Sequence, residues 1–484
     1  MGVPGVSLLT SLARLRALDE GIAQPIATVR HCHLRDQPMV FIPLKLSGEA
    51  AAPLAAMLGT ERDRPRLLVV SQPRNRDLRF AWAAELAGVL LPYIARFLAD
   101  TETVERRGAD PYERALDAPQ LIVPNAAGVA FTRLLGRSTR FRRADGPYPV
   151  PDVVPLLGRW LTYFGERAAY PGSSLMLAAT EELGRHWASG QSSLEDANLA
   201  ALLGWITEGP SDAAEDPLIW PPAGPATDPG FDAEVLAPAI DSGSAERITE
   251  ALRSQLEPTW RLMWQAIDLL AGLEAGASVA QRWEQDRGSF SGMAQSIAEG
   301  APPQARRDGA IAAAAKLARM ERAQAGYEVQ RAYDDPLIMA EYRLTGEAFA
   351  GEVIETVPDN VEGEGRSRKL RPLVVIKTDD PVRLPPGASL GTPQRRGQGA
   401  ELVSADEGLV TVKITKGMGR GKTPTPGAVP EVGERVCYTS LTDDFQGSPN
   451  LPDAEATPWT HGGPPQHHAA EHTPDDEDAQ EEWS

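Results

Sequence analysis

Residues 416–433, KGMGRGKTPTPGAVPEVG, have the residue types of a phosphate-binding loop. Gly-Lys-Thr occupies 421–423, which is the residue order at the end of that motif. In a true phosphate-binding loop the backbone N–H groups and the lysine surround the phosphates. The first position of that motif must be glycine but is Lys416, and the prolines within 424–430 prevent the helix that should follow. The stretch therefore predicts a hairpin tip between two strands, and no ATP site.

The chemistry left to this region is attraction of phosphate groups, because glycine permits close approach and basic side chains supply the charge. The basic residues fall into three clusters: Lys413, Lys416, Arg420 and Lys422; Arg366, Arg368, Lys369 and Arg371; Arg395 and Arg396. Residues 351–440 contain thirteen basic and twelve acidic residues. The clusters therefore bind nucleic acid only if they share one face, and otherwise they are solvated loop charges.

A denser cluster occurs at residues 132–143, TRLLGRSTRFRR, which contain five arginines and Phe141. Four of them, Arg133, Arg137, Arg140 and Arg143, would share one helical face. Arg142 would lie beside that face. This spacing predicts a surface that binds anions or nucleic acid. The alternative is a basic rim that pairs with acidic groups elsewhere in the fold or in the tail.

The spacing of histidines, cysteines and acidic residues in the sequence does not indicate a metal site or a catalytic site. His31 and His33 would lie on one face of a strand, but two nitrogen ligands do not form a zinc site, and ordinary strand residues are the prediction. No hydrolase, metalloprotease or dinucleotide-binding motif occurs. We therefore predict no catalytic residue, cofactor or metal. An enzyme site near the ends of the strands at 38–46 and 66–70 is the alternative.

The elements that must position these residues suggest a multidomain α+β protein. Residues 1–145 predict a mixed α/β domain, with a helix at 78–100 and strands at 25–34, 38–46, 66–70 and 120–124. Helical patterns fill 146–207, where Ser193 is the predicted N-cap of the last helix. Residues 208–243 are rich in proline and predict a linker.

A long antiparallel helical hairpin is predicted for 244–335, turning at Pro302-Pro303, with a kink at Pro258 and an interruption near Gly288 or Gly292. Its tryptophans could stack on bases, but on long helices they more often anchor packing: Trp260, Trp264 and Trp283. Residues 336–441 change to a period of two and predict a small antiparallel β-barrel of about five strands.

Residues 442–484 predict a disordered acidic tail that contains histidines. The formal charge of the chain is −19, but residues 441–484 hold eleven acidic residues and no lysine or arginine. The two cysteines lie far apart in sequence and the N-terminus lacks a signal-peptide pattern, so we expect a cytoplasmic location. The longest apolar stretch, 86–98, is too short to span a bilayer, and no membrane partner is predicted.

Residues 244–441, a helical hairpin followed by a basic-looped barrel that contains PEVGERVCYTSL, resemble the stalk and inserted barrel of superfamily-one helicases of the nonsense-mediated-decay type. The resemblance covers about forty per cent of the chain, and the helicase motor domains are missing. It implies an accessory subunit that works with a separately encoded ATPase.

These patterns predict a non-enzymatic, nucleic-acid-associated accessory or adaptor protein that contacts DNA or RNA through the barrel loops and the arginines of 133–143. The tail, with Trp459 in a proline- and glycine-rich stretch, is a predicted docking or self-masking segment. Two other classes stay open: an enzyme with its site in the N-terminal domain, and a protein–protein scaffold.

Overall fold

The computed structural model describes residues 7–106, 108–209, 225–363, 368–419, 421, 423–442 and 450–451. Its body is built on a five-stranded sheet in the order β4-β3-β2-β7-β8. The strands are β2 (Met39–Lys45), β3 (Pro53–Gly59), β4 (Arg66–Val69), β7 (Leu121–Val123) and β8 (Met176–Ala178). β2, β3 and β4 are antiparallel, whereas β7 and β8 run parallel to β2. The predicted mixed α/β character of this region is confirmed.

The strands predicted at 38–46, 66–70 and 120–124 are present as β2, β4 and β7. The strand predicted at 25–34 is wrong, because only β1 (Gln24–Pro25) pairs there, with β9 (Trp187–Ala188), and most of 26–34 is irregular. The sequence pattern did not predict β3, since PLAAMLG is rich in alanine and poor in β-branched residues.

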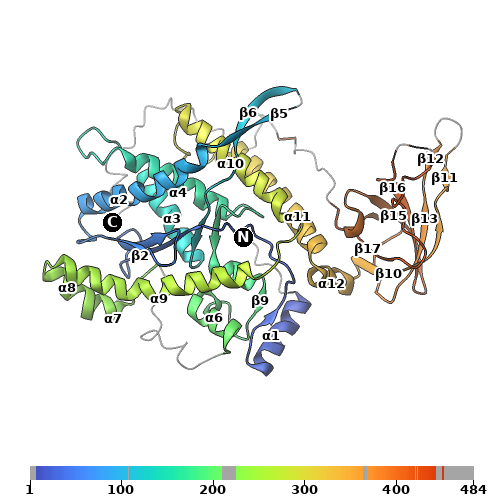
Figure 1. Cartoon of the computed structure of the whole chain (residues 1–484), viewed down its shortest axis with the longest axis horizontal. Helices are drawn as coiled ribbons and strands as arrows, with labels where there is room; N and C mark the ends of the chain where they lie inside the picture. The colour runs from blue at the N-terminus through green and yellow to red at the C-terminus, as the bar shows by residue number, and fades with distance from the viewer. Residues whose placement is uncertain are drawn as a thin grey trace, which may run out of the picture.

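Alternate side chains of β2 point into two different cores, as the pleat of a strand requires. Phe41 packs among α2 (Arg76–Ala95), α3 (Ala126–Thr139), α4 (Val153–Ala168) and α10 (Val279–Ala298). Ile42 packs among α5 (Ala179–Gly184), α6 (Leu199–Thr207), α8 (Ala237–Asp241) and α9 (Ala245–Ala271). Figure 1 shows α9 on one side of β2 and the helices α2 and α4 on the other. The sheet is therefore covered on both faces.

Several smaller elements complete the body. They are α1 (Leu8–Glu20), η1 (Arg96–Leu98), the hairpin β5 (Thr101–Arg106) and β6 (Ala109–Ala115), and η2 (Glu195–Ala197). The predicted N-cap at Ser193 is wrong, because η2 lies between Ser193 and α6. The N-cap of α6 is Asn198, whose side chain accepts hydrogen bonds from the first backbone amides of that helix. The helix α2 together with η1, Arg76–Leu98, is long and apolar enough for a membrane span, but half of its most apolar window is buried inside the body.

The linker predicted at 208–243 is wrong for its second half. Residues 210–224 lie outside the described part, but α7 (Pro229–Phe231), the π-helical turn η4 (Asp232–Leu236) and α8 follow. Leu236 and Ala239 are buried in the core beside α9. These short helices belong to the body because their apolar residues cover the same sheet face as α9.

The long helical segment consists of α9, α10 and α11 (Ala310–Asp334). The chain breaks at 272–278 and again at 299–309, around Pro302-Pro303, whereas Gly288 and Gly292 lie inside α10, and α9 continues through Pro258. The predicted two-helix hairpin is thus wrong for its first half, since α9 packs on the sheet. A helical period in the sequence shows that one face of a helix is apolar, but it does not identify the element that packs against that face.

The C-terminal region begins with α12 (Pro336–Thr345) and closes into a barrel. Its six strands, in spatial order, are β10 (Ala348–Val357), β13 (Leu373–Lys377), β16 (Leu409–Lys416), β15 (Gly399–Asp406), β14 (Ser389–Gly391) and β17 (Arg435–Thr439). A small hairpin of β11 (Val361–Glu362) and β12 (Lys369–Leu370) projects from it, and the 3-10 turn η6 (Pro393–Arg395) follows β14. The predicted barrel is confirmed, with the short β14 as the strand the pattern missed.

The hairpin tip predicted between β16 and β17 is wrong, because β16 pairs with β13 and β15, whereas β17 pairs with β10 and β14. The segment 417–434 instead connects two strands that are not neighbours. Most of the predicted acidic tail, 443–449 and 452–484, lies outside the described residues.

Candidate functional site: an arginine surface and a buried polar junction

Arginines from distant segments meet around one buried ring at the end of the body. The guanidinium of Arg76, at the start of α2, lies 4.8 Å from the centroid of Phe80. The guanidinium of Arg142, which follows α3, lies 5.2 Å from the same ring. Such contacts are favourable because the ring face is electron-rich. They hold two arginines from different segments in defined positions.

A second ring organises the neighbouring arginines. The guanidinium of Arg306, in the segment after α10, lies 5.2 Å from Phe141, and that of Arg140 lies 4.6 Å from it. Arg140 is only 4% exposed, and its side chain donates to the carbonyl oxygens of Gln304 (2.9 Å) and Ala305. Arg140 therefore anchors the 304–307 segment against α3.

An exposed aromatic side chain lies beside these arginines. Tyr148 is 47% exposed, its ring centroid is 5.7 Å from the guanidinium of Arg76, and its carbonyl oxygen accepts a hydrogen bond from Arg76 at 2.8 Å. The loop that presents it is closed by the amide of Val150, which donates to the carbonyl oxygen of Arg143. Arg137 is exposed in the last turn of α3, just before this segment of the chain. We call the side chains of Arg76, Arg137, Arg142, Arg143, Tyr148 and Arg306 the arginine surface.

The charge balance of this end of the body is strongly positive. Residues 76–79, 133–145 and 304–307 contain nine arginines and two aspartates. Asp77 contacts Arg76 at 2.9 Å, and a hydrogen bond from Arg143 lowers the pKa of Asp145. These two carboxylates, and Asp308 next to the 304–307 segment, offset only part of the arginine charge.

The arginines predicted from 132–143 are not arranged as expected. Arg133 and Arg137 are exposed on α3, but that helix ends at Thr139, so Arg142 and Arg143 lie in the following loop. The prediction of one helical face is wrong for Arg140, which is buried. Sequence reasoning missed Arg76, Tyr148 and Arg306, since nothing in the local pattern says that 76–80, 148 and 306 lie together.

Two of the basic residues predicted in the barrel, Lys413 and Arg371, have acidic or carbonyl partners. Lys413 pairs with Glu362 (3.0 Å) and Glu401 (3.2 Å). Arg371 donates to the carbonyl oxygens of Leu370 and Thr415. Other predicted residues, all exposed, are Arg368, Lys369 and Lys416. The predicted residues Arg366, Arg420 and Lys422 lie outside the described part of the chain.

The third predicted cluster serves the fold. Arg395 pairs with Glu434 inside the barrel region, and Arg396 pairs with Asp334 at the end of α11. Figure 1 shows α2 at one end of the long axis of the molecule and the barrel at the other. Among the residues that the structure describes, the basic side chains of the body and those of the barrel therefore do not form one continuous surface.

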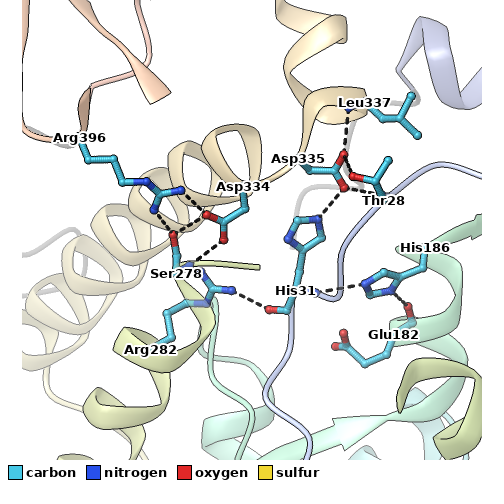
Figure 2. A network of polar contacts seen from close by, with 10 residues as sticks. All are labelled: Thr28, His31, Glu182, His186, Ser278, Arg282, Asp334, Asp335, Leu337 and Arg396. Atoms are coloured by element: carbon cyan, nitrogen blue, oxygen red, sulfur yellow. Dashed lines mark hydrogen bonds and ion pairs between the residues drawn. The ribbon is translucent and has the colours of Figure 1, made fainter. Parts of the chain in front are cut away.

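A buried polar junction lies where the body, α11, α12 and the barrel meet (Figure 2). The carboxylate of Asp335 accepts hydrogen bonds from the amide and hydroxyl of Thr28 and from the amide of Leu337, at 2.7, 2.9 and 2.9 Å. Nε2 of His31 lies 3.4 Å from the same carboxylate. Although burial alone would raise the pKa of Asp335, these contacts hold it at about 2.

Two histidines stack within this junction. The rings of His31 and His186 have centroids 5.7 Å apart, and the amide of His31 donates to Nε2 of His186 at 3.2 Å. Nδ1 of His186 contacts the carbonyl oxygen of Glu182 at 2.6 Å. Burial lowers the pKa of both imidazoles, so both are neutral at pH 7.

A second carboxylate links the barrel to this junction. The side chain of Asp334 is completely buried, and its carboxylate accepts hydrogen bonds from the amide and hydroxyl of Ser278 and pairs with Arg396 of the barrel. Arg396 also donates to the hydroxyl of Ser278 at 2.6 Å. Arg282 donates to the carbonyl oxygen of His31 at 2.7 Å. The junction thus fastens four parts of the chain together and has a structural role.

The predicted strand arrangement of His31, Cys32 and His33 is wrong. His31 points to Asp335, whereas His33 stacks on Trp283 with ring centroids 4.0 Å apart. Burial raises the pKa of the Cys32 thiol well above its ordinary value, which leaves the thiol protonated and unreactive. Among the described residues, no group of three or more His, Cys, Asp or Glu side chains is placed to hold a metal ion.

The tryptophans act as packing anchors, as the sequence favoured. Trp260, Trp264 and Trp283 are 3%, 7% and 8% exposed. The indole N–H of Trp260 donates to the carbonyl oxygen of Arg62, and that of Trp283 donates to Asp117. Rings buried in this way are not available to stack on bases.

Two surface hollows were found beside α9. One, of about 500 Å³, lies between α8 and α9 and includes Glu234 and Arg247. The other, of about 630 Å³, lies at the start of β4, and four of its five charged groups form pairs, Arg62 with Asp268 and Arg261 with Glu257. Ion pairs of this kind are typical of a hydrated surface.

No protein-family model, curated protein or solved structure matches the chain.

Proposed function

We propose that this protein is a non-enzymatic, cytoplasmic, nucleic-acid-associated accessory or adaptor protein that binds DNA or RNA through the arginine surface. The observation that carries the proposal is the convergence of Arg76, Arg142 and Arg306 on two rings, Phe80 and Phe141, next to the exposed Tyr148. Guanidinium groups suit phosphate oxygens because their N–H donors form a planar fork.

The arrangement favours contact with the nucleic-acid backbone over readout of base sequence. Arginines that already rest on rings lose less side-chain entropy when they bind phosphate than free ones do. Tyr148 offers an aromatic face on which an unpaired base can stack. We therefore expect single strands to bind more tightly than duplexes, with little dependence on sequence.

The barrel would supply the adaptor role. It lies at the other end of the molecule from α2, so a partner that binds the barrel would not compete with nucleic acid on the arginine surface. A separately encoded ATPase remains the proposed partner of the 244–441 region, and the Trp459 stretch a proposed docking segment.

The test is binding of labelled single- and double-stranded DNA and RNA over a range of salt concentrations. Arg137→Glu and Arg143→Glu together should weaken binding at least tenfold and reduce the slope of log affinity against log salt by about two. The matched control is Arg64→Glu, since Arg64 is an exposed arginine at the turn between β3 and β4. Equal affinity of the double variant and wild type, or no binding at low salt, would refute the proposal.

The acidic tail gives the same experiment a second arm. Because residues 441–484 carry eleven acidic and no basic side chains, the tail can compete with phosphate for the arginine surface. A chain that ends at Leu441 should then bind nucleic acid more tightly than the full chain at low salt. Unchanged affinity would remove the masking role and leave the binding proposal intact.

A further inference from the structure

Helix α1 presents its apolar side to solvent. Leu8, Leu12, Leu15 and Leu18 are 60%, 46%, 59% and 57% exposed, and Ile22, just past the helix, is 38% exposed. At 100° per residue the four leucines form one stripe on the helix. The completely buried residue is Ala17, on the opposite side. An ordinary surface helix buries its leucines, so this helix has the reverse orientation.

The body holds α1 by the side opposite the stripe, where Ala17 is buried and Leu9 and Ala13 are half-buried. The guanidinium of Arg14 contacts Asp196 at 3.5 Å, and the amide of Ala23 donates to the carbonyl oxygen of Trp205. The hydroxyl of Ser7 caps the start of the helix, and Gly21 ends it in the left-handed conformation at φ 67°. Figure 1 shows α1 at the edge of the body. The leucine stripe is therefore fixed in an outward position by both ends of the helix.

We infer that the occupant of this stripe is the α1 helix of a second copy of the chain. The five apolar residues are symmetric about Leu15: in an antiparallel pair, Leu15 meets Leu15, Leu12 meets Leu18, and Leu8 meets Ile22. A twofold interface requires this property, because when residue i of one subunit contacts residue j of the other, residue j of the first must also contact residue i of the second. The spacing of these residues is the same in both directions along the sequence, with Ile22 placed just past the end of the helix at Gly21.

The charges beside the stripe argue against a membrane surface as the occupant. Arg14 is engaged with Asp196, and the exposed charged residues of the helix include Arg16, Asp19 and Glu20. An interfacial membrane helix normally carries a lysine- or arginine-rich polar face. The mixed charges here give no net attraction to anionic lipid.

The size of the stripe sets the strength of the dimer. Stable complexes bury roughly 1,200–2,000 Å², and five side chains from one short helix fall below that range. We therefore expect a reversible dimer that dissociates in the micromolar range of concentration.

The experiment is sedimentation velocity of the full chain at total concentrations from about 1 to 100 μM, which bracket a micromolar dissociation constant. Wild type should shift from monomer to dimer over this range. Leu15→Glu places two carboxylates against each other on the twofold axis and should give a monomer throughout, with unchanged urea unfolding. Leu194→Glu, at a leucine that is 84% exposed outside α1, should dimerise like wild type.

Cross-linking supplies an independent readout. Leu15→Cys should form a disulfide-linked dimer under mild oxidation, because only the residue on the axis meets itself, whereas Glu20→Cys should not. The two native cysteines are free and buried, so they give no background. A monomer at every concentration, a dimer that survives Leu15→Glu, or co-sedimentation of monomer with phosphatidylserine vesicles that Leu15→Glu abolishes would each overturn the proposal.

Discussion

His33 connects the pH of the solution to the stability of the body. Burial lowers its pKa from 6.5 to about 4, and its ring stacks on Trp283. The unfolded chain takes up a proton more readily than the folded one, so the unfolding free energy is highest above pH 6.5 and falls as the pH decreases toward 4. His33→Phe keeps a ring against Trp283 and should make this loss smaller by up to about 3 kcal/mol, measured by urea unfolding at pH 7.5 and 4.5.

The neighbouring titrations separate this prediction from its alternatives. The pKa values of His31 and His186 are also lowered by burial, so a weaker pH dependence of the same sign should remain in the variant. Asp335 acts in a different pH range. Its pKa is about 2, so its contribution to the unfolding free energy is lost only as the pH falls from 3.8 toward 2. A His33→Phe variant with the full wild-type pH dependence would contradict the assignment.

The crossing of α3 and α4 is the element on which the arginine surface depends. The two helices approach closely at glycines: a Cβ on Gly136 would lie 2.6 Å from the amide nitrogen of Thr162, and one on Gly158 would lie against the amide nitrogen of Arg140 and 2.7 Å from its Cα. Backbone cannot move aside as a flexible side chain can. We expect Gly158→Ala to lower the unfolding free energy by about 2 to 4 kcal/mol, the range of overpacking and strain.

Gly88 provides the matched control for that variant. It lies inside α2, and a Cβ there would meet nothing within 4 Å. Gly88→Ala should therefore raise the unfolding free energy by about 0.5 to 1 kcal/mol, because alanine favours the helix. Urea unfolding of both variants measures the difference. Similar stabilities for the two would show that the helices separate to accept a Cβ.

The elements that could be predicted from sequence are those whose own pattern specifies them. The helix α2 and the strands β10, β13, β15, β16 and β17 follow from periods of 3.6 and 2. The junction could not be predicted, since Thr28 bonds to Asp335 across 307 residues and no local pattern links them. The arginine surface was half predicted: 133–143 are dense in charge, but Arg76 and Arg306 join them only in the fold.

At the scale of the molecule, Arg396 supplies the main polar contact of the barrel with the end of α11. It bonds to Asp334 and Ser278, and the hydroxyl of Tyr333 donates to the carbonyl oxygen of Leu441 nearby, at 2.8 Å. The remaining contacts include an apolar cluster in which Ala332 of α11 and Met339 of α12 pack against Ala348 and Cys437 of the barrel. The pair of Arg343 with Asp380 adds a polar contact beside it. The orientation of the barrel thus depends on this apolar cluster together with the polar contacts of Arg396.

Arg396→Ala should loosen that orientation without unfolding the barrel. We expect a larger radius of gyration by small-angle X-ray scattering and faster amide hydrogen exchange at 333–338, because interfaces of this limited size allow domain motion. A double-mutant cycle with Asp334→Ala should give a coupling energy of about 1 kcal/mol or more, as for residues in direct contact. Arg395→Ala is the neighbouring control, since Arg395 pairs with Glu434 and should change barrel stability alone. An unchanged radius of gyration in Arg396→Ala, or an equal increase in Arg395→Ala, would show that α12 and the barrel hold their position without the Arg396–Asp334 pair.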